Sequence, residues 1–258
     1  MTVSIHPTAL VEPNAELGSG VTIGPYAVVE GGARIGNDTA IAAHAVVHST
    51  TQLGARCHLG IGAVLGSAPQ DLKYAEEPTE LIVGDRTQIR EYATVNRGTS
   101  VTGVTTIGRD CFLMAYVHIA HDCVVGDSVV MANAVQLGGH VSVEAHVQIG
   151  GMTAIHQFTS VGVHAFVGGG SRVAQDIPPY AMAVGNPARL YGVNTEGLRR
   201  AAFPAERRLA LKRAFRLLFN SDLTRAAATE RLRAEYPEVP EVLRLLDFVS
   251  RSQRGVLV

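Results

Sequence analysis

The chain has 258 residues and a formal net charge of −1, with 47% hydrophobic residues, only 5% aromatic residues and no tryptophan. It contains no apolar run long enough to span a bilayer, and its N-terminus lacks the basic and apolar segments of a signal peptide. Three cysteines without paired spacing (Cys57, Cys111 and Cys123) argue against a disulfide framework. We therefore expect a soluble protein of the reducing cytoplasm.

Aliphatic residues recur at every sixth position from Ile5 to Val173. They occupy 27 of the 29 positions of this series, which fails only at Asp71 and Glu77. A period of six does not match the 3.6-residue period of an α-helix, but it fits a solenoid whose units each supply one short strand and one turn. Three units form a coil of about 18 residues, and equivalent side chains stack inward from coil to coil. The sequence predicts a parallel β-helix over residues 1–191.

Two polar segments interrupt the repeat without changing its phase. The first is "GSAPQDLKYAEEPTE", residues 66–80, and the second is "RGTSVTGVTT", residues 97–106, in which Val101 keeps the repeat position. Long loops in a compact solenoid are more often functional than ornamental. We expect both segments to leave the prism as loops.

The repeat ends before residue 192, and the remaining chain has helical character. Helices are expected from Pro204 to near Asn220, over residues 224–235, and within residues 238–252. A small helical domain over residues 192–258 would cover the open end of the solenoid and protect its edge strands. Residues 1–191 hold nine Lys and Arg against fifteen Asp and Glu, whereas residues 192–258 hold thirteen against eight. This asymmetry indicates either an acidic partner for the tail or ordinary solvated arginines.

The segment "HIAHDCVVG", residues 118–126, places polar groups between repeat positions. A step of about 18 residues stacks His121 on Gly139 and Asp122 on His140, at outward or corner positions. Three hypotheses follow: solvated surface histidines, a zinc site, or a histidine base oriented by Asp122. The adjacent aspartate favours the base.

The glycines of "LGGH", residues 137–140, add to that hypothesis. A backbone N–H from Gly138 or Gly139 could face a developing oxyanion with no side chain in the way. No serine nucleophile paired with a histidine stands out, so a substrate hydroxyl is expected to attack directly.

The chain resembles the UDP-N-acetylglucosamine O-acyltransferases, hexapeptide-repeat enzymes that begin lipid A biosynthesis. The resemblance runs from about residue 5 to the C-terminus and rests on "QDLKYAEEPT", "IREYATVNRGT", "VHIAHDCVVG", "LGGHVSV", "IGGMTAIHQF" and "GVNTEGLRR". It implies a left-handed parallel β-helix that transfers an (R)-3-hydroxyacyl chain from acyl carrier protein to the sugar 3-hydroxyl. It also implies a homotrimer with sites between subunits, no nucleic acid partner and no stable membrane insertion.

The same resemblance assigns roles to residues that match the family motifs. His121 is similar to the general base, Asp122 to its orienting partner and Gly139 to the oxyanion donor. The implied substrate-binding residues are Gln70, Asp71, Lys73, His118, His140, His156, Gln157, Asn194, Glu196 and Arg200. Gly169 matches the position that limits acyl-chain length, where a small residue leaves room for a long chain. No metal is implied, and no cofactor beyond the 4′-phosphopantetheine of the carrier protein.

Three alternatives remain open from the sequence. The sister N-acyltransferase usually carries an additional N-terminal uridine-binding domain, whereas this repeat starts at Ile5, and some homologues prefer an amino sugar as acceptor. A zinc-dependent hydratase of the gamma carbonic anhydrase type would use the histidines as ligands. A purely structural or carrier-binding solenoid would not need His121.

Overall fold

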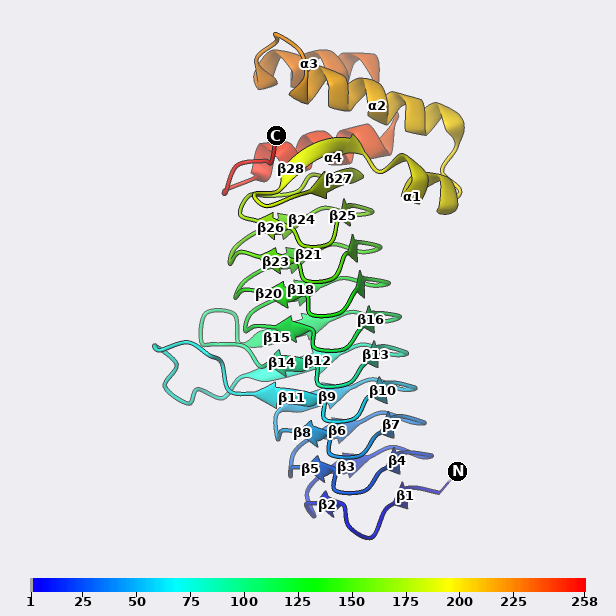
Figure 1. Cartoon of the computed structure of the whole chain (residues 1–258), viewed down its shortest axis with the longest axis vertical. Coiled ribbons are helices and arrows are strands. Elements are labelled where there is room, and N and C mark those ends of the chain that lie inside the picture. The colour runs from blue at the N-terminus through cyan, green and yellow to red at the C-terminus, as the bar shows by residue number, and fades with distance from the viewer. Residues whose placement is uncertain (1) are drawn as a thin grey trace.

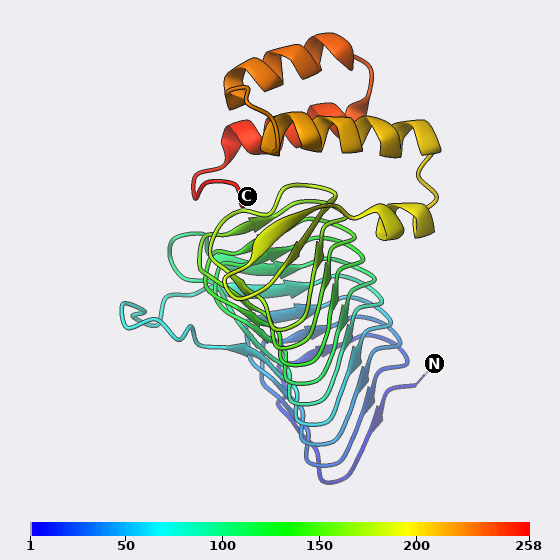
Figure 2. The same cartoon turned by 45° about the horizontal axis from the view of Figure 1, so that its top comes forward.

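The structure, a computed structural model, describes residues 2–258, and Met1, the first residue of the expected solenoid range, lies outside it. Short strands wind into a tall prism with three sheets as its sides, and the helices gather above its C-terminal end (Figure 1). In an oblique view along the prism the coils have a triangular outline (Figure 2). The parallel β-helix predicted from the six-residue repeat is confirmed.

Each side of the prism is one sheet, and the sheets are named A, B and C in the order in which a coil visits them. Sheet A contains β1 (Ser4–Ile5), β4 (Thr22–Ile23), β7 (Ala40–Ile41), β10 (His58–Leu59), β13 (Gln88–Ile89), β16 (Phe112–Leu113), β19 (Val130–Met131), β22 (Gln148–Ile149), β25 (Phe166–Val167), β27 (Ala181–Val184) and β28 (Arg189–Val193). All its pairs are parallel except the last, β27 with β28.

The other two sheets are parallel throughout. Sheet B contains β2 (Leu10–Val11), β5 (Val28–Val29), β8 (Val46–Val47), β11 (Val64–Ser67), β14 (Thr94–Asn96), β17 (His118–Ile119), β20 (Gln136–Leu137), β23 (Ala154–Ile155) and β26 (Arg172–Val173). Sheet C contains β3 (Glu16–Leu17), β6 (Arg34–Ile35), β9 (Thr51–Leu53), β12 (Glu80–Val83), β15 (Val104–Ile107), β18 (Val124–Val125), β21 (Ser142–Val143) and β24 (Ser160–Val161). The turns between sheets form the A–B, B–C and C–A corners.

Aliphatic side chains stack inside the prism because the parallel register advances by one whole coil. In a regular coil the partner strand lies 18 residues further on, as for Ile5 with Ile23. The ladders pair the backbone groups of neighbouring coils, which leaves the narrow interior to side chains. Leu59, Leu113 and Ile119 are among the fully buried residues of the resulting core, which is continuous along the prism axis.

Two coils are longer than the others, and both carry their additional residues at the B–C corner. The register advances by 30 residues from Leu59 to Ile89 and by 24 residues from Ile89 to Leu113. The insertions are therefore twelve and six residues long. Because both lengths are multiples of six, the aliphatic series resumes in phase after each insertion.

Both loops are shorter than the sequence predicted. Residues 66–67 end β11 and residue 80 begins β12, so the first loop is 68–79. Residues 104–106 belong to β15, so the second loop is 97–103. The repeat position predicted for Val101 is wrong, because this side chain is 74% exposed in the second loop. Val101 falls on the six-residue series only because the inserted segment is itself six residues long.

Residues at the corners adopt the left-handed backbone region. At the B–C corner φ is +59° for Asp122, +60° for His140 and +63° for Phe158. The same conformation recurs at the other corners, for example at Tyr92 and His146. A left-handed non-glycine residue often marks local strain at a site, but here it belongs to the general geometry of the coil.

Four helices cover the C-terminal end of the prism: α1 (Thr195–Arg200), α2 (Ala205–Phe219), α3 (Arg225–Glu235) and α4 (Pro240–Arg251). α2 contacts α3, α4 and β28. The last three helices match the predicted ranges to within about two residues. Among the helices of residues 2–258, none combines the length and the apolar character needed to cross a bilayer.

Polar contacts join the helical cap to the prism. Arg244 of α4 lies 3.1 Å from Glu144, and the Ser252 hydroxyl donates to Asp176 at 2.7 Å. The domain boundary at residue 192 stays a prediction, and β28 continues just past it, to Val193. β28 pairs with β27 in a hairpin that covers the last parallel edge of sheet A, so the strand must extend as far as its partner.

We expect Leu59→Ala to lower the free energy of unfolding by about 2–5 kcal/mol, because the prism cannot close around the missing side chain. His58→Ala is a matched control on the same strand, since His58 is exposed, and should change stability by about 0.5 kcal/mol or less. Chemical denaturation followed by circular dichroism measures both variants. Equal losses would contradict the inward stacking of Leu59.

Candidate functional site

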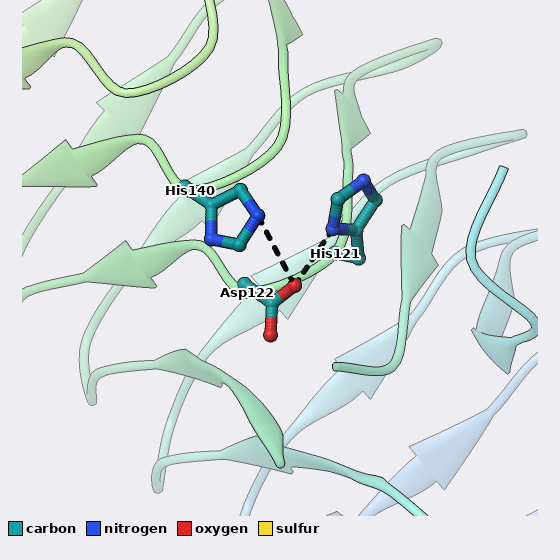
Figure 3. A group of neighbouring side chains, drawn as sticks. All are labelled: His121, Asp122 and His140. Atoms are coloured by element: carbon teal, nitrogen blue, oxygen red, sulfur yellow. Dashed lines mark hydrogen bonds and ion pairs between the residues drawn. The ribbon is translucent and has the colours of Figure 1, made fainter. Parts of the chain in front are cut away.

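His121, Asp122 and His140 meet at the B–C corner, with Asp122 between the two rings (Figure 3). His121 follows β17, and its Nδ1 lies 2.7 Å from Asp122 Oδ2. His140 occupies the same corner one coil further on, with its Nε2 3.6 Å from that oxygen. In the tautomer that donates Nδ1–H to Asp122, His121 keeps Nε2 free to accept a proton.

The Asp122 side chain has no exposed surface, and four hydrogen bonds occupy its two oxygens. Oδ1 accepts from the Thr99 amide at 3.0 Å and from the Thr102 hydroxyl, while Oδ2 accepts from the Thr99 hydroxyl at 2.7 Å and from His121. Burial by itself would raise the pKa of Asp122, but the hydrogen bonds from Thr102, His121 and Thr99 outweigh it and lower the pKa to about 2. Asp122 is therefore ionised at neutral pH.

Gly139 leaves the space that the His121 ring occupies. A Cβ atom at Gly139 would lie 2.5 Å from His121 Cε1 and 2.7 Å from His121 Nε2. The Gly139 carbonyl accepts from the Phe158 amide at 3.1 Å, whereas its N–H has no acceptor within the described chain. A backbone N–H without an acceptor can donate to an oxyanion that forms next to it.

Other residues predicted for the site lie on the same side of the prism. His118 on β17 has its Nδ1 2.8 Å from Thr94 Oγ1, and burial, followed by the nearby His121, lowers the pKa of His118. His156 and Gln157 are exposed at the B–C corner, one coil beyond Gly139, and His156 Nδ1 lies 3.1 Å from the Gln157 carbonyl. The structure thus brings these histidines to one edge.

The first loop carries Gln70, Asp71 and Lys73 outward from the B–C corner (Figure 1). Gln70 and Lys73 are exposed, and the Lys73 amide donates to Asp71 Oδ1 at 3.0 Å. Arg97 joins the two loops, because its guanidinium donates to the Tyr74 hydroxyl at 2.8 Å. The loops are therefore fastened to each other beside the corner that holds the histidines.

A pocket of about 490 Å³ opens between α1, sheet A and the C–A corner. Asn194 caps α1, with its side chain accepting from the Gly197 amide at 3.0 Å. The Glu196 carboxylate lies 2.8 Å from the Arg199 guanidinium and 3.1 Å from that of Arg200. The hydrogen bond from Arg199 is the main reason why the pKa of Glu196 falls to about 2, and Arg200 adds to the effect. Asn194, Glu196 and Arg200 therefore form one polar wall of this pocket.

Two stacked imidazoles form another wall of the same pocket. The His146 and His164 rings lie 4.7 Å apart at the C–A corner. Burial, followed by the neighbouring His146 and Arg244, lowers the pKa of His164 to about 4, so this ring is uncharged at neutral pH. The sequence pattern marks neither histidine, because their pairing depends on the stacking of two coils.

The structure does not bring the α1 residues together with His121 in one chain. α1 projects on the side of the prism opposite to the two loops (Figures 1 and 2). Gly169 lies at a third place, the A–B corner, where an added Cβ would be 3.1 Å from the Gly151 carbonyl. A single chain thus presents three separate parts of the predicted site.

His121, Asp122 and His140 also offer three metal-ligand atoms within 4.8 Å of one another. A carboxylate has about four acceptor positions, and hydrogen bonds already use four at Asp122. A metal ion would have to displace these donors. The arrangement favours a histidine base over a zinc site.

Thr99 and Thr102 are contacts of the site that sequence reasoning missed. The only signal for them is the turn-rich second loop, which lies one coil before Asp122 at the same corner. Which of its hydroxyls reach the carboxylate depends on the path of the loop.

Two family descriptions match the chain: "Bacterial transferase hexapeptide (six repeats)" over residues 105–139, and "Udp N-acetylglucosamine O-acyltransferase; Domain 2" over residues 176–257. The acyl-[acyl-carrier-protein]–UDP-N-acetylglucosamine O-acyltransferase of Myxococcus xanthus is 49% identical, with 98% of each chain covered. The protein of the same name from Burkholderia mallei is 44% identical over 98% of each chain.

Solved structures agree with these relatives. LpxA from Acinetobacter baumannii superposes with a TM-score of 0.96 at 39% identity, covering 98% of this chain and 99% of that one. The UDP-N-acetylglucosamine O-acyltransferase of Moraxella catarrhalis has a TM-score of 0.95 at 41% identity, with the same coverage. These likenesses confirm the left-handed β-helix and do not favour the zinc-dependent hydratase or the sister N-acyltransferase. Because the likeness extends over nearly the whole chain, the chain belongs to the UDP-N-acetylglucosamine O-acyltransferase family.

Proposed function

We propose that this chain transfers an (R)-3-hydroxyacyl group from the 4′-phosphopantetheine arm of acyl carrier protein to the 3-hydroxyl of UDP-N-acetylglucosamine, as the first step of lipid A biosynthesis. Its family and close relatives support this reaction. The observation that carries the mechanism is the 2.7 Å contact between His121 and the buried, ionised Asp122. The mechanism requires no metal and no cofactor beyond the carrier arm.

In this mechanism the His121 Nε2 accepts the proton of the sugar 3-hydroxyl while its oxygen attacks the thioester carbonyl. The new C–O bond forms, the carbonyl π electrons move to oxygen, and the Gly139 N–H donates to that oxyanion. When the intermediate collapses, the C–S bond breaks and the sulfur takes the proton from His121. No acyl-enzyme forms, because the attacking group is the hydroxyl of the sugar.

The remaining residues at the B–C corner are proposed to bind the two substrates. Lys73 would hold a phosphate, Asp71 the sugar, and Gln70 would assist; the exposure of Lys73 in the first loop supports this assignment. The residues proposed to line the sugar and pantetheine channel all lie on sheet B or at its edge near His121: His118, His140, His156 and Gln157.

We propose a homotrimer, because one chain separates the two halves of the site. His121 lies where sheet B meets sheet C, whereas Asn194, Glu196 and Arg200 line a pocket over sheet A. Three triangular prisms that meet at their A–B corners leave three wedge-shaped clefts. Sheet B of one copy then faces sheet A of the next, and each cleft receives both halves.

An apolar stripe along the A–B corner supports this arrangement. Tyr26, Tyr92, Tyr116 and Met152 are all more than half exposed, and Ile61 is 45% exposed. The Tyr92 and Tyr116 rings stack at 5.4 Å, one coil above the other. Exposed apolar residues gathered along one edge mark an interaction surface, and this edge is the one that would lie at the threefold axis.

Acyl carrier protein is the proposed second partner. Residues 192–258 hold thirteen Lys and Arg against eight Asp and Glu, which would attract an acidic protein. The carrier and the free, buried thiols of Cys57, Cys111 and Cys123 agree with a cytoplasmic location, which we also propose.

Gly169 is proposed to set the length of the acyl chain. It lies at the opposite edge of sheet B from His121, so a chain bound across this sheet would end near it. Neither Gly169 nor Gly151 has a side chain, and an added Cβ at Gly169 would lie 3.1 Å from the Gly151 carbonyl, so a larger residue here would shorten the space proposed for the chain.

We expect His121→Ala to lower kcat by about 10²–10⁴-fold with the fold intact, because proton transfer to Nε2 is lost. His6→Ala, which removes an exposed histidine in the first coil, should leave kcat unchanged. Mass spectrometry of the acylated sugar nucleotide measures both. Retention of most activity by His121→Ala would refute its role as the base.

A mixture of two inactive variants tests the shared site. Co-assembled His121→Ala and Arg200→Ala subunits should regain about a quarter of wild-type activity. In a random mixture, about a quarter of the sites take an intact His121 from one subunit and an intact Arg200 from its neighbour. A mixture of His121→Ala with Asp122→Asn should regain none, because both changes fall in one half. Equal inactivity of the two mixtures would show that neighbouring copies do not share the site.

Gly169→Met should shift donor preference toward shorter acyl chains, because its side chain would fill the far end of the proposed groove. Thr106→Met on sheet C is the matched control and should keep the wild-type profile. Competition among carrier-bound donors of different length measures the preference. An unchanged profile for Gly169→Met would place the length limit elsewhere.

A further inference from the structure

The second loop encloses the Asp122 carboxylate. The loop supplies three of its four hydrogen bonds: the Thr99 amide at 3.0 Å, the Thr99 hydroxyl at 2.7 Å and the Thr102 hydroxyl. The fourth is the contact with His121. An inserted segment, rather than the repeat itself, therefore determines how this carboxylate is held.

The second loop is fastened at both ends, so its hydroxyls have defined positions. The Gly98 amide donates to the Glu80 carbonyl at 3.1 Å, and the Glu80 amide donates to the Gly103 carbonyl at 2.9 Å. The Thr99 hydroxyl accepts from the Val101 amide at 3.2 Å, which leaves its proton for Asp122. The donors around the carboxylate are thus arranged before any substrate binds.

Asp122 has two histidines within reach, and only one of them is its partner. His121 Nδ1 lies 2.7 Å from Oδ2, whereas His140 Nε2 lies 3.6 Å from the same oxygen. Both nitrogens face the same oxygen, so a rotation of the carboxylate would change both distances. The donors from the loop oppose that rotation, because each oxygen would lose a hydrogen bond.

We propose that Thr99 and Thr102 are positioning residues, which act through Asp122 to keep the His121 imidazole in the tautomer and orientation that leave Nε2 free for the sugar hydroxyl. This inference rests on the proposed role of His121 as general base. It extends that role to two hydroxyls that touch neither substrate nor the reacting atoms.

Removal of the loop donors should change the charge that Asp122 presents to His121 in a definite direction. The loop donors share the negative charge of Asp122, so their removal leaves more of that charge to favour protonated His121. The other titratable groups that face the pair are His140, His118, whose pKa is lowered by burial and then by His121, and Cys123, whose pKa is raised to about 12 chiefly by burial. His118 and Cys123 are thus uncharged near neutral pH.

The first experiment compares the wild-type enzyme with Thr99→Val, Thr102→Val and the corresponding serine variants. Each valine variant should lower kcat by about tenfold while changing the KM for the sugar nucleotide by less than about twofold. In a plot of kcat against pH, the acid limb should move to higher pH. The serine variants keep a hydroxyl and should restore both properties.

Thr106→Val is the matched control for this comparison. Thr106 lies on β15, and its side chain makes no hydrogen bond to Asp122 among residues 2–258. Thr102 is exposed, so the Thr102→Val protein is expected to fold even if Thr99→Val does not. If folded Thr102→Val has the wild-type dependence of kcat on pH, the proposed role of Thr102 is overturned. A loss of kcat without any shift of the acid limb would indicate a merely structural role.

A second experiment separates this inference from the proposed function. In an Asp122→Asn background Thr102→Val should cause no further loss of kcat, because the charge through which it acts is gone. An equal loss in both backgrounds would overturn the inference alone. If His121→Ala retains activity in the same assay, the proposed base fails as well.

Discussion

The ladder of inward aliphatic side chains is the constraint on which the rest of this structure depends. A coil with two-residue strands buries little by itself, so the core exists only because Leu59, Ile89, Leu113 and their equivalents stack in register. This stacking fixes the inward position of every unit. Polar side chains are therefore left to outward positions and corners, and both insertions lie at a corner, where they break no ladder. The histidines and both loops accordingly lie at corners or on the outer face.

The chemistry of the B–C corner depends on this division between a fixed interior and variable corners. A fully buried carboxylate is costly unless its charge is hydrogen-bonded, and the coil alone offers Asp122 only its neighbour His121. The second loop supplies the missing donors through Thr99 and Thr102. A six-residue insertion thus makes an ionised aspartate possible beside His121, and the low pKa of Asp122 keeps it ionised at neutral pH.

The separation of the α1 pocket from His121 relates the shape of the prism to its proposed assembly. A triangular prism directs its three faces away from one another, so residues on sheet A and at the B–C corner cannot meet within one chain. The apolar A–B corner lies between these faces. Association along that edge covers the stripe and brings opposite faces together, so one contact would account for both the exposed tyrosines and the divided site.

The sequence by itself determined the repeat, the extent of the prism to within a few residues, three of the four helices, and the stacking of Asp122 below His140. These features follow from spacing along the chain, because a fixed period converts residue number directly into position. Only the tertiary structure decided that Val101 is exposed, that Gly139 makes room for the His121 ring, that Thr99 and Thr102 hold Asp122, and that Arg200 lies far from His121. These depend on the path of a loop and on the direction of a face, which contacts between distant residues establish and a local period does not record.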